Sequence, residues 1–149
     1  MTEESDAGWQ PTVPALVQLV AASRAPRLRA AFAAAGIDGI RPAQAVALVP
    51  LATGPLHASD LAARLRVSRQ AVAQAIRPLE RHGYVVRSPD TVDARAMLIE
   101  LTPLGRKALR VMRDNAVSLE RRWQQLLGPE RLDDLRATLR LLLADSDVE

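Results

Sequence analysis

The most informative stretch of the sequence is SRQAVAQAIRPLERHGY, from Ser68 to Tyr84, which has the pattern of a helix with one polar face. Its apolar residues Val72, Ile76 and Leu79 are four and three positions apart, so they form one stripe. Glutamine and arginine recur at helical spacing on the other side. Because glutamine can form two hydrogen bonds with the edge of adenine, and arginine with that of guanine, this face suits contact with DNA bases. The candidate contact residues are Arg69, Gln70, Ala73, Gln74, Arg77 and Arg81.

Individual positions on this helix indicate more specific roles. Gln74 and Arg77 are expected to touch base edges, whereas Arg81, near the end of the helix, is expected to touch phosphate only. Ala73 allows the helix to sit close to DNA and can contact a thymine methyl group. Ser68 is the expected N-cap, and the free N–H groups beside it offer a phosphate site. The alternative is a polar face that is merely solvated.

Pro78 interrupts the pattern at a position from which proline is normally excluded. It has no N–H to donate to the carbonyl of Gln74, and its ring crowds that carbonyl. We therefore expect a bend near Gln74–Pro78, with the carbonyl facing solvent. The segment Arg69–Arg77 would meet DNA before the bend, and Leu79 beyond it would belong to the core.

The charge of the chain is unevenly distributed. The 149 residues carry a net charge of only +3, but acidic residues gather at both ends, and residues 11–143 hold 20 basic against 11 acidic side chains. Between Leu61 and Arg87 there are six arginines and a single acid, Glu80. Such a cluster attracts polyanions, and arginine in particular binds phosphate and guanine through two parallel hydrogen bonds. A basic but merely solvated surface is the alternative.

The composition argues against metalloproteins, disulfide-bonded proteins and enzymes. There is no cysteine, and the two histidines, His57 and His82, are 25 residues apart, so neither a metal site nor a disulfide is expected. No glycine-rich phosphate loop, H-E-x-x-H motif or Ser–His–Asp pattern is present, so we expect no catalytic residues and no cofactor. No apolar run reaches the roughly 18 residues of a membrane span, and no signal sequence is visible, which predicts a cytoplasmic protein without a membrane partner.

Around the polar-faced helix the sequence predicts a mainly α fold with a small β-hairpin. Proline and N-cap residues mark helix ends, with Pro26 expected to bend or split the first helix and Thr102 to cap a later one. The strand-like segments YVVR and AMLIEL flank the polar stretch SPDTVDAR, which predicts a hairpin with a long tip. The expected helices cover residues 13–35, 42–52, 58–65, 69–83, 104–127 and 130–144.

The order of these elements predicts a winged helix-turn-helix domain flanked by N- and C-terminal helices. Helix 58–65, a tight turn, the polar-faced helix and the hairpin make up the winged part. Helices 13–35, 104–127 and 130–144 carry apolar stripes that a domain of this size leaves uncovered. A second copy of the chain is the simplest partner for them, so we expect a homodimer with these helices as its dimerisation helices.

The segment from Ser59 to Leu109 resembles the core of the MarR family, the multiple-antibiotic-resistance type of transcriptional regulators. The matching pieces are LAARL, LERHGYVVR, the wing sequence DAR at residues 93–95 and LTPLG at residues 101–105. The flanking helices also occur in the family's order, so the resemblance covers about residues 13–144.

The resemblance implies how the chain would meet DNA. Helix 69–83 would lie in the major groove of a palindromic operator, and the wing would touch the minor groove. In the wing, Arg95 is the implied contact, next to Asp90 and Asp93. A salt bridge from Arg95 to either acid, which would only shape the loop, is the alternative.

The resemblance also implies an effector. Family members often lose DNA affinity when a small, frequently aromatic, anion binds between the dimer helices and the winged domain. That site is expected near Arg24, Arg27 and His57, between helices 13–35 and 42–52 and the winged domain.

The sequence departs from the family pattern at several positions. Arg66 stands where the turn between the motif helices often has glycine, and a left-handed conformation there would cost on the order of 1 kcal/mol. Ala73 replaces a frequent threonine or serine, His57 replaces a frequent helix cap, and Ala94 removes one charge from the wing. Each departure bears on one contact rather than on the fold.

We therefore expect a disordered acidic N-terminus over residues 1–12, a single MarR-like domain over 13–144 and an acidic tail over 145–149. Residues 13–35 and 104–144 would dimerise, and residues 42–101 would form the DNA-binding winged helix. The expected function is that of a sequence-specific transcriptional regulator, a repressor released by a small ligand. Two alternatives are a winged-helix protein-interaction module without DNA binding, and a small enzyme or ligand carrier.

Overall fold

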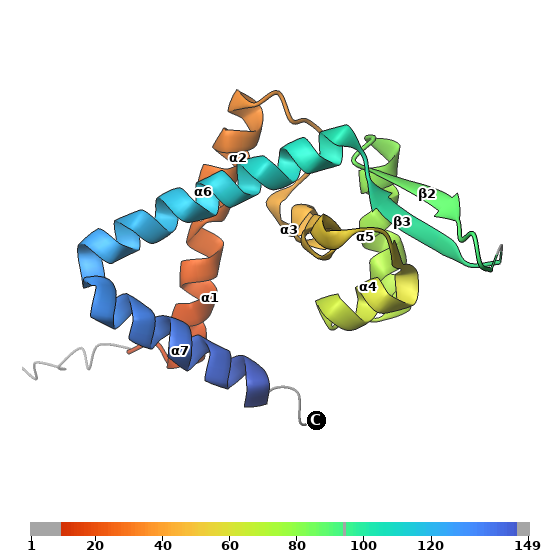
Figure 1. The fold of residues 1–149 in the computed structure, drawn as a ribbon. Coiled ribbons are helices and arrows are strands. Elements are labelled where there is room, and N and C mark those ends of the chain that lie inside the picture. Colours follow the sequence, from red (N-terminus) through yellow and green to blue (C-terminus); the bar gives the residue numbers. More distant parts are fainter. Residues whose placement is uncertain (1–9, 94, 146–149) are drawn as a thin grey trace, which may run out of the picture.

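A computed structural model describes residues 10–93 and 95–145 of the chain (Figure 1). Most of the two expected acidic end segments, and Ala94 in the wing, lie outside the described residues. Within the described part, helices dominate and three short strands form one sheet. No helix in these two ranges combines the length and the apolar character needed to cross a membrane.

The N-terminal helical region is split, as expected from Pro26. Helix α1 covers Val13–Ser23 and α2 covers Ala25–Ala34, with Pro26 in the first turn of α2, where its missing N–H is not needed. Gly36, with φ of +70°, follows the end of α2. Left-handed backbone at this position is the usual way for a helix to stop.

The prediction of one helix over residues 42–52 is wrong for the second part of this segment. Helix α3 covers only Pro42–Ala45, and the chain continues as a 3₁₀-helix, η1, over Val46–Thr53. Pro50 lies inside η1 and has no N–H to donate. An α-helical hydrogen-bond ladder cannot run through such a residue, and a tighter helix replaces it.

The helix-turn-helix has the predicted boundaries at its first helix and at its turn. Helix α4 covers Ala58–Leu65, and α5 covers Arg69–Arg81. The hydroxyl of Ser68 accepts the N–H of Ala71 at 3.1 Å, which confirms the predicted N-cap. Arg66 has φ of +56° and ψ of +45°, the left-handed conformation in which a side chain costs about 1–2 kcal/mol.

The wing contains one more strand than the predicted hairpin. Strands β2, Val85–Pro89, and β3, Met97–Leu101, pair antiparallel as expected. The additional strand β1, Leu56–His57, pairs with the other edge of β3, which gives the order β1-β3-β2. Two residues are too few to show the alternation that indicates a strand in a sequence.

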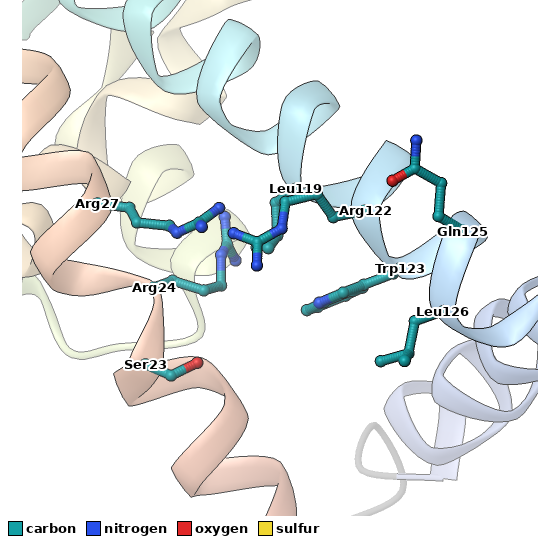
Figure 2. A pocket seen from close by; sticks show the side chains of 8 residues that line it. All are labelled: Ser23, Arg24, Arg27, Leu119, Arg122, Trp123, Gln125 and Leu126. Carbon is teal, nitrogen blue, oxygen red and sulfur yellow. The ribbon is translucent and has the colours of Figure 1, made fainter.

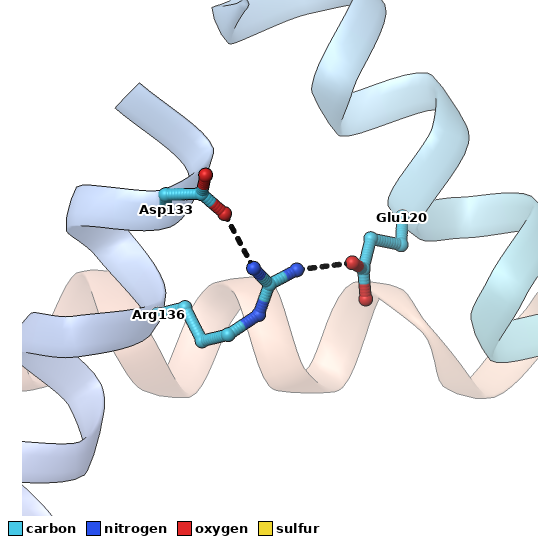
Figure 3. A network of polar contacts seen from close by, with 3 residues as sticks. All are labelled: Glu120, Asp133 and Arg136. Atoms are coloured by element: carbon cyan, nitrogen blue, oxygen red, sulfur yellow. Dashed lines mark hydrogen bonds and ion pairs between the residues drawn. The ribbon is translucent and has the colours of Figure 1, made fainter. Parts of the chain in front are cut away.

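The two C-terminal helices agree with the prediction. Helix α6 covers Pro103–Leu127 and α7 covers Pro129–Asp145, separated by Gly128. Arg136 of α7 binds both Glu120 of α6 and Asp133 of its own helix (Figure 3). Since all three side chains are well exposed, these ion pairs orient the corner between the helices more than they stabilise it.

The core lies between α2, η1, the winged part and the start of α6, and the outer helices are left largely uncovered. Phe32, Leu48, Ile76 and Tyr84 are at most 2% exposed. In contrast, no residue of α1 is buried, and in α7 only Leu132 is. Helix α6 leads away from the sheet and α7 doubles back from its far end (Figure 1). The last turn of α7 meets the winged part where the guanidinium of Arg66 donates to the carbonyl of Leu143 at 3.3 Å. The apolar side chains exposed on α1 are Val13, Leu16, Val17, Leu19 and Val20.

Candidate nucleic-acid interface

Helix α5 has the two faces that its sequence predicts. Val72, Ile76 and Leu79 are at most 1% exposed, so the apolar stripe is fully packed against the core. The opposite face is free, since no side chain on it forms an ion pair within the described ranges. The predicted contact residues on this face are all exposed: Ser68, Arg69, Gln70, Ala73, Gln74, Arg77 and Arg81.

The proline inside α5 does not end the helix. The helix runs unbroken through Pro78 and continues to Arg81, with His82 as its C-cap and Gly83 at φ of +80° beyond it. It therefore ends two residues before the predicted limit at residue 83, because left-handed backbone follows the cap. The bend that we expect near Gln74–Pro78 stays a prediction.

Two acids shape the tip of the wing through the backbone. The carboxylate of Asp90 accepts the N–H of Val92 at 3.0 Å, and that of Asp93 accepts the N–H of Arg95 at 3.0 Å. Arg95 is exposed, and its guanidinium forms no ion pair with a residue that the structure describes. The structure therefore has no salt bridge from Arg95 to Asp90 or Asp93, which was the alternative. The guanidinium of Arg95 is free to bind an external anion.

His57 occupies a different place from the one expected. It lies in β1, opposite Leu98, and its Nε2 is 3.0 Å from the carboxylate of Asp90. The histidine thus joins the edge strand to the tip of the wing. The structure does not bring it to Arg24 and Arg27, so the predicted grouping of these three residues is corrected.

Arg24 and Arg27 line a hollow of about 530 Å³ between the α1–α2 junction and the second half of α6 (Figure 2). Arg122 faces them from α6, so three guanidinium groups gather next to the ring of Trp123 (Figure 2). None of the three forms an ion pair within the described residues. Sequence reasoning missed Arg122, because nothing distinguishes it locally among 19 arginines. The residues that line the hollow are Ser23, Arg24, Arg27, Leu119, Arg122, Trp123, Gln125 and Leu126.

The sequences LERHGYVVR and LTPLG are packed against each other and hold α5, the wing and α6 together. The hydroxyl of Thr102 donates to the carbonyl of Gly83 at 2.5 Å and accepts the N–H of Gly105 at 3.1 Å. The buried Tyr84 donates its hydroxyl to the carbonyl of Asp38 at 2.5 Å. Burial, together with the nearby Asp38 carboxylate, raises the pKa of Tyr84, so the phenol stays neutral and remains a donor.

Comparison with known proteins agrees with this geometry. Residues 38–96 match the model of the MarR family. The transcriptional activatory protein BadR of Rhodopseudomonas palustris is 32% identical over 94 residues, which are 63% of this chain and 53% of BadR. The chain therefore spans about half the length of this curated relative.

Solved structures match over a larger part of the chain. A probable transcriptional regulator from Pseudomonas aeruginosa is 28% identical, with a TM-score of 0.63 over 85% of this chain and 96% of its own. The S. aureus MepR–DNA complex is 22% identical, with a TM-score of 0.74 over 91% of this chain and 99% of its own, which shows a common fold. The winged-helix part of the chain, residues 38–96, is thus similar to the MarR family, and the fold around it is shared with solved transcriptional regulators.

Proposed function

We propose that this chain is a homodimeric transcriptional regulator that binds duplex DNA. The observation that carries the proposal is the exposed, unpaired glutamine and arginine face of α5, whose other face is fixed in the core. A similar fold binds DNA in the S. aureus MepR complex. The alternative, a winged-helix protein-interaction module, is less favoured, because glutamine and arginine at helical spacing are the side chains that pair with base edges.

The dimensions of α5 fit the major groove. At 1.5 Å per residue, the segment from Arg69 to Arg77 is about 12 Å long. The groove is also about 12 Å wide, so the side chains of this segment reach base edges across its whole width. Arg95 at the tip of the wing would then meet the neighbouring minor groove. Residues 42–101 thus form the DNA-binding part of a single domain over residues 13–144.

A second copy of the chain would cover the helices that the core leaves exposed. The valine and leucine side chains of α1 are 45–65% exposed, and Leu141 and Leu143 of α7 are 73% and 59% exposed. A surface of this kind marks an interface. We propose that residues 13–35 and 104–144 interlock in a symmetric dimer, and that the two α5 helices bind half-sites about 10 base pairs, or a multiple of that, apart. Light scattering that reports a monomer at micromolar concentration would refute this.

The regulator is proposed to act as a repressor that leaves its DNA when a small anion binds to it. The support is the hollow next to Trp123, where Arg24, Arg27 and Arg122 concentrate positive charge without an acidic partner among the described residues. A carboxylate would be held by the guanidinium groups, and an aromatic ring attached to it would stack on the indole. A thermal-shift screen of small aromatic acids tests this, since a ligand that binds only the folded state raises its stability.

DNA binding is tested with the purified chain and the DNA that lies upstream of its own gene. The affinity is measured over a range of salt concentrations. Each phosphate that the protein neutralises releases counterions, so the logarithm of the affinity should fall linearly and steeply with the logarithm of the salt concentration. A slope near zero would favour the protein-interaction module instead.

A further inference from the structure

A second basic hollow lies at the far end of α5, away from the three-arginine hollow. It has a volume of about 550 Å³ and is formed between the loop that leads into α3 and the last turn of α5. Arg41 borders it from the loop, and Arg81 and His82 border it from α5. No acidic residue lines it, so its chemistry is that of an anion site.

The loop that carries Arg41 is held firmly against the end of α5. The carbonyl of Asp38 accepts the hydroxyl of the buried Tyr84. The next residue, Gly39, has φ of +73°, and a Cβ there would lie only 2.4 Å from the ring of His82. The imidazole therefore packs directly on the glycine backbone. A side chain at position 39 would displace the His82 ring from this contact, so Gly39 allows the loop to lie directly against the end of α5.

The polar side chains at the mouth of the hollow are available for a ligand. Arg41 and Arg81 are exposed, and neither forms an ion pair with a described residue. The neighbouring acid Glu80 is bound by Arg87 at 2.6 Å. The side-chain oxygen of Gln44 accepts the N–H of Arg41 at 3.0 Å, which leaves its amide N–H groups free to donate.

The hollow begins where the DNA-reading face of α5 ends. Arg81 is one helical turn beyond Arg77 and lies on the same face. Since the segment up to Arg77 already spans the width of the major groove, Arg81 reaches the phosphates that border it. We propose, on the basis of the DNA-binding function proposed above, that Arg41 and Arg81 together hold one backbone phosphate of the duplex. Arg41 lies outside the helix-turn-helix and the wing, so the DNA-contacting surface extends to the loop before α3.

The variants R41Q, R81Q and R41Q/R81Q test the proposal by the salt dependence of their binding to a short duplex of mixed sequence. If both guanidinium groups are needed to hold one phosphate in each protomer of the dimer, each single variant should flatten the slope by about 1.8, that is about 0.9 for each half-site. The double variant should flatten it no further. A slope change of this size corresponds to about thirtyfold weaker binding of the dimer at 0.15 M salt and about two-hundredfold weaker binding at 0.05 M. The charge-retaining variants R41K and R81K are the matched controls: they alter the same two positions without removing a charge and should keep most of the wild-type slope.

The outcomes separate this inference from the function on which it rests. If wild-type protein shows no salt-dependent binding to any duplex, the proposed function fails. If wild-type protein binds but R41Q keeps the wild-type slope, only the inference is wrong. A double variant that flattens the slope by twice as much as each single variant would mean two separate phosphates and would also overturn it.

A free anion is the other possible occupant of the hollow. Inorganic phosphate, added at constant ionic strength, should not raise the melting temperature of wild-type protein more than that of R41Q/R81Q. If it does, and the slopes for duplex DNA are unchanged by the substitutions, the hollow is a small-anion site and the assignment to DNA is refuted. Unchanged circular dichroism spectra would establish that the variants are folded, and R41K, which keeps the charge, should retain most of the slope.

Discussion

Replacing Gly105 with alanine should destabilise this protein, although alanine is normally the better residue in a helix. Gly105 lies in the first turn of α6. An added Cβ would lie 2.1 Å from the carbonyl oxygen of Tyr84 and 3.1 Å from Cδ2 of Leu101. Because real Cβ contacts stay beyond 3.0 Å, the start of α6 and the backbone before β2 would have to separate by about 0.9 Å.

The expected loss of stability is about 1–3 kcal/mol. Forcing an extra carbon into a packed site costs about 1–3 kcal/mol. The same Tyr84 oxygen accepts the N–H of Thr102 at 3.1 Å, and losing that bond would add about 1 kcal/mol. The opposing gain, from replacing glycine by alanine in a helix, is about 1 kcal/mol at most.

Urea or thermal unfolding, followed by circular dichroism at a fixed protein concentration, measures this difference. Ser118→Ala, on the exposed surface of α6, is the control for helix propensity and should gain a few tenths of a kcal/mol. If Gly105→Ala is as stable as the wild type or more so, the close approach of α6 to Tyr84 is not what requires glycine in LTPLG.

Three further variants test the reading of DNA, the effector and the packing of the wing. Gln74→Ala should relax the preference at one base pair by about 1–3 kcal/mol across single-base variants of the operator, and a uniform loss of affinity would show that Gln74 reads no base. Arg24→Ala combined with Arg27→Ala should abolish the response of DNA binding to any small anion, and an unchanged response would place the effector elsewhere. Tyr84→Phe should cost about 1 kcal/mol at neutral pH. Because burial raises the pKa of Tyr84, the stability that the neutral phenol contributes is present below pH about 10 and is lost as the pH rises through the folded-state pKa, so the wild type but not the variant should weaken there. Parallel alkaline curves would contradict that account.

Helix ends were predictable from the sequence, because the interactions that set them are local. Ser68 and Thr102 cap the helices that follow them, and each accepts an N–H three residues ahead. Gly128 separates α6 from α7 by the conformational freedom of a single residue. The buried stripe of α5 was equally readable, since its period requires no knowledge of what covers it.

The errors concern segments whose structure depends on distant partners. Strand β1 forms because it can pair with the edge of β3. A segment of two residues is too short for its sequence to indicate this pairing. Residues 46–53 look apolar and helical, but whether they form an α-helix or a 3₁₀-helix depends on how Pro50 is accommodated.

The sequence by itself determined the chemistry of the surface that we propose faces DNA, because the residue types on one face of one helix follow from helical periodicity alone. Only the tertiary structure decided which charged groups meet across elements. It paired His57 with Asp90 rather than with Arg24, brought Arg122 to Arg27, and placed Arg41 beside Arg81. Such encounters depend on the packing of segments up to about a hundred residues apart, and local spacing carries no information about them.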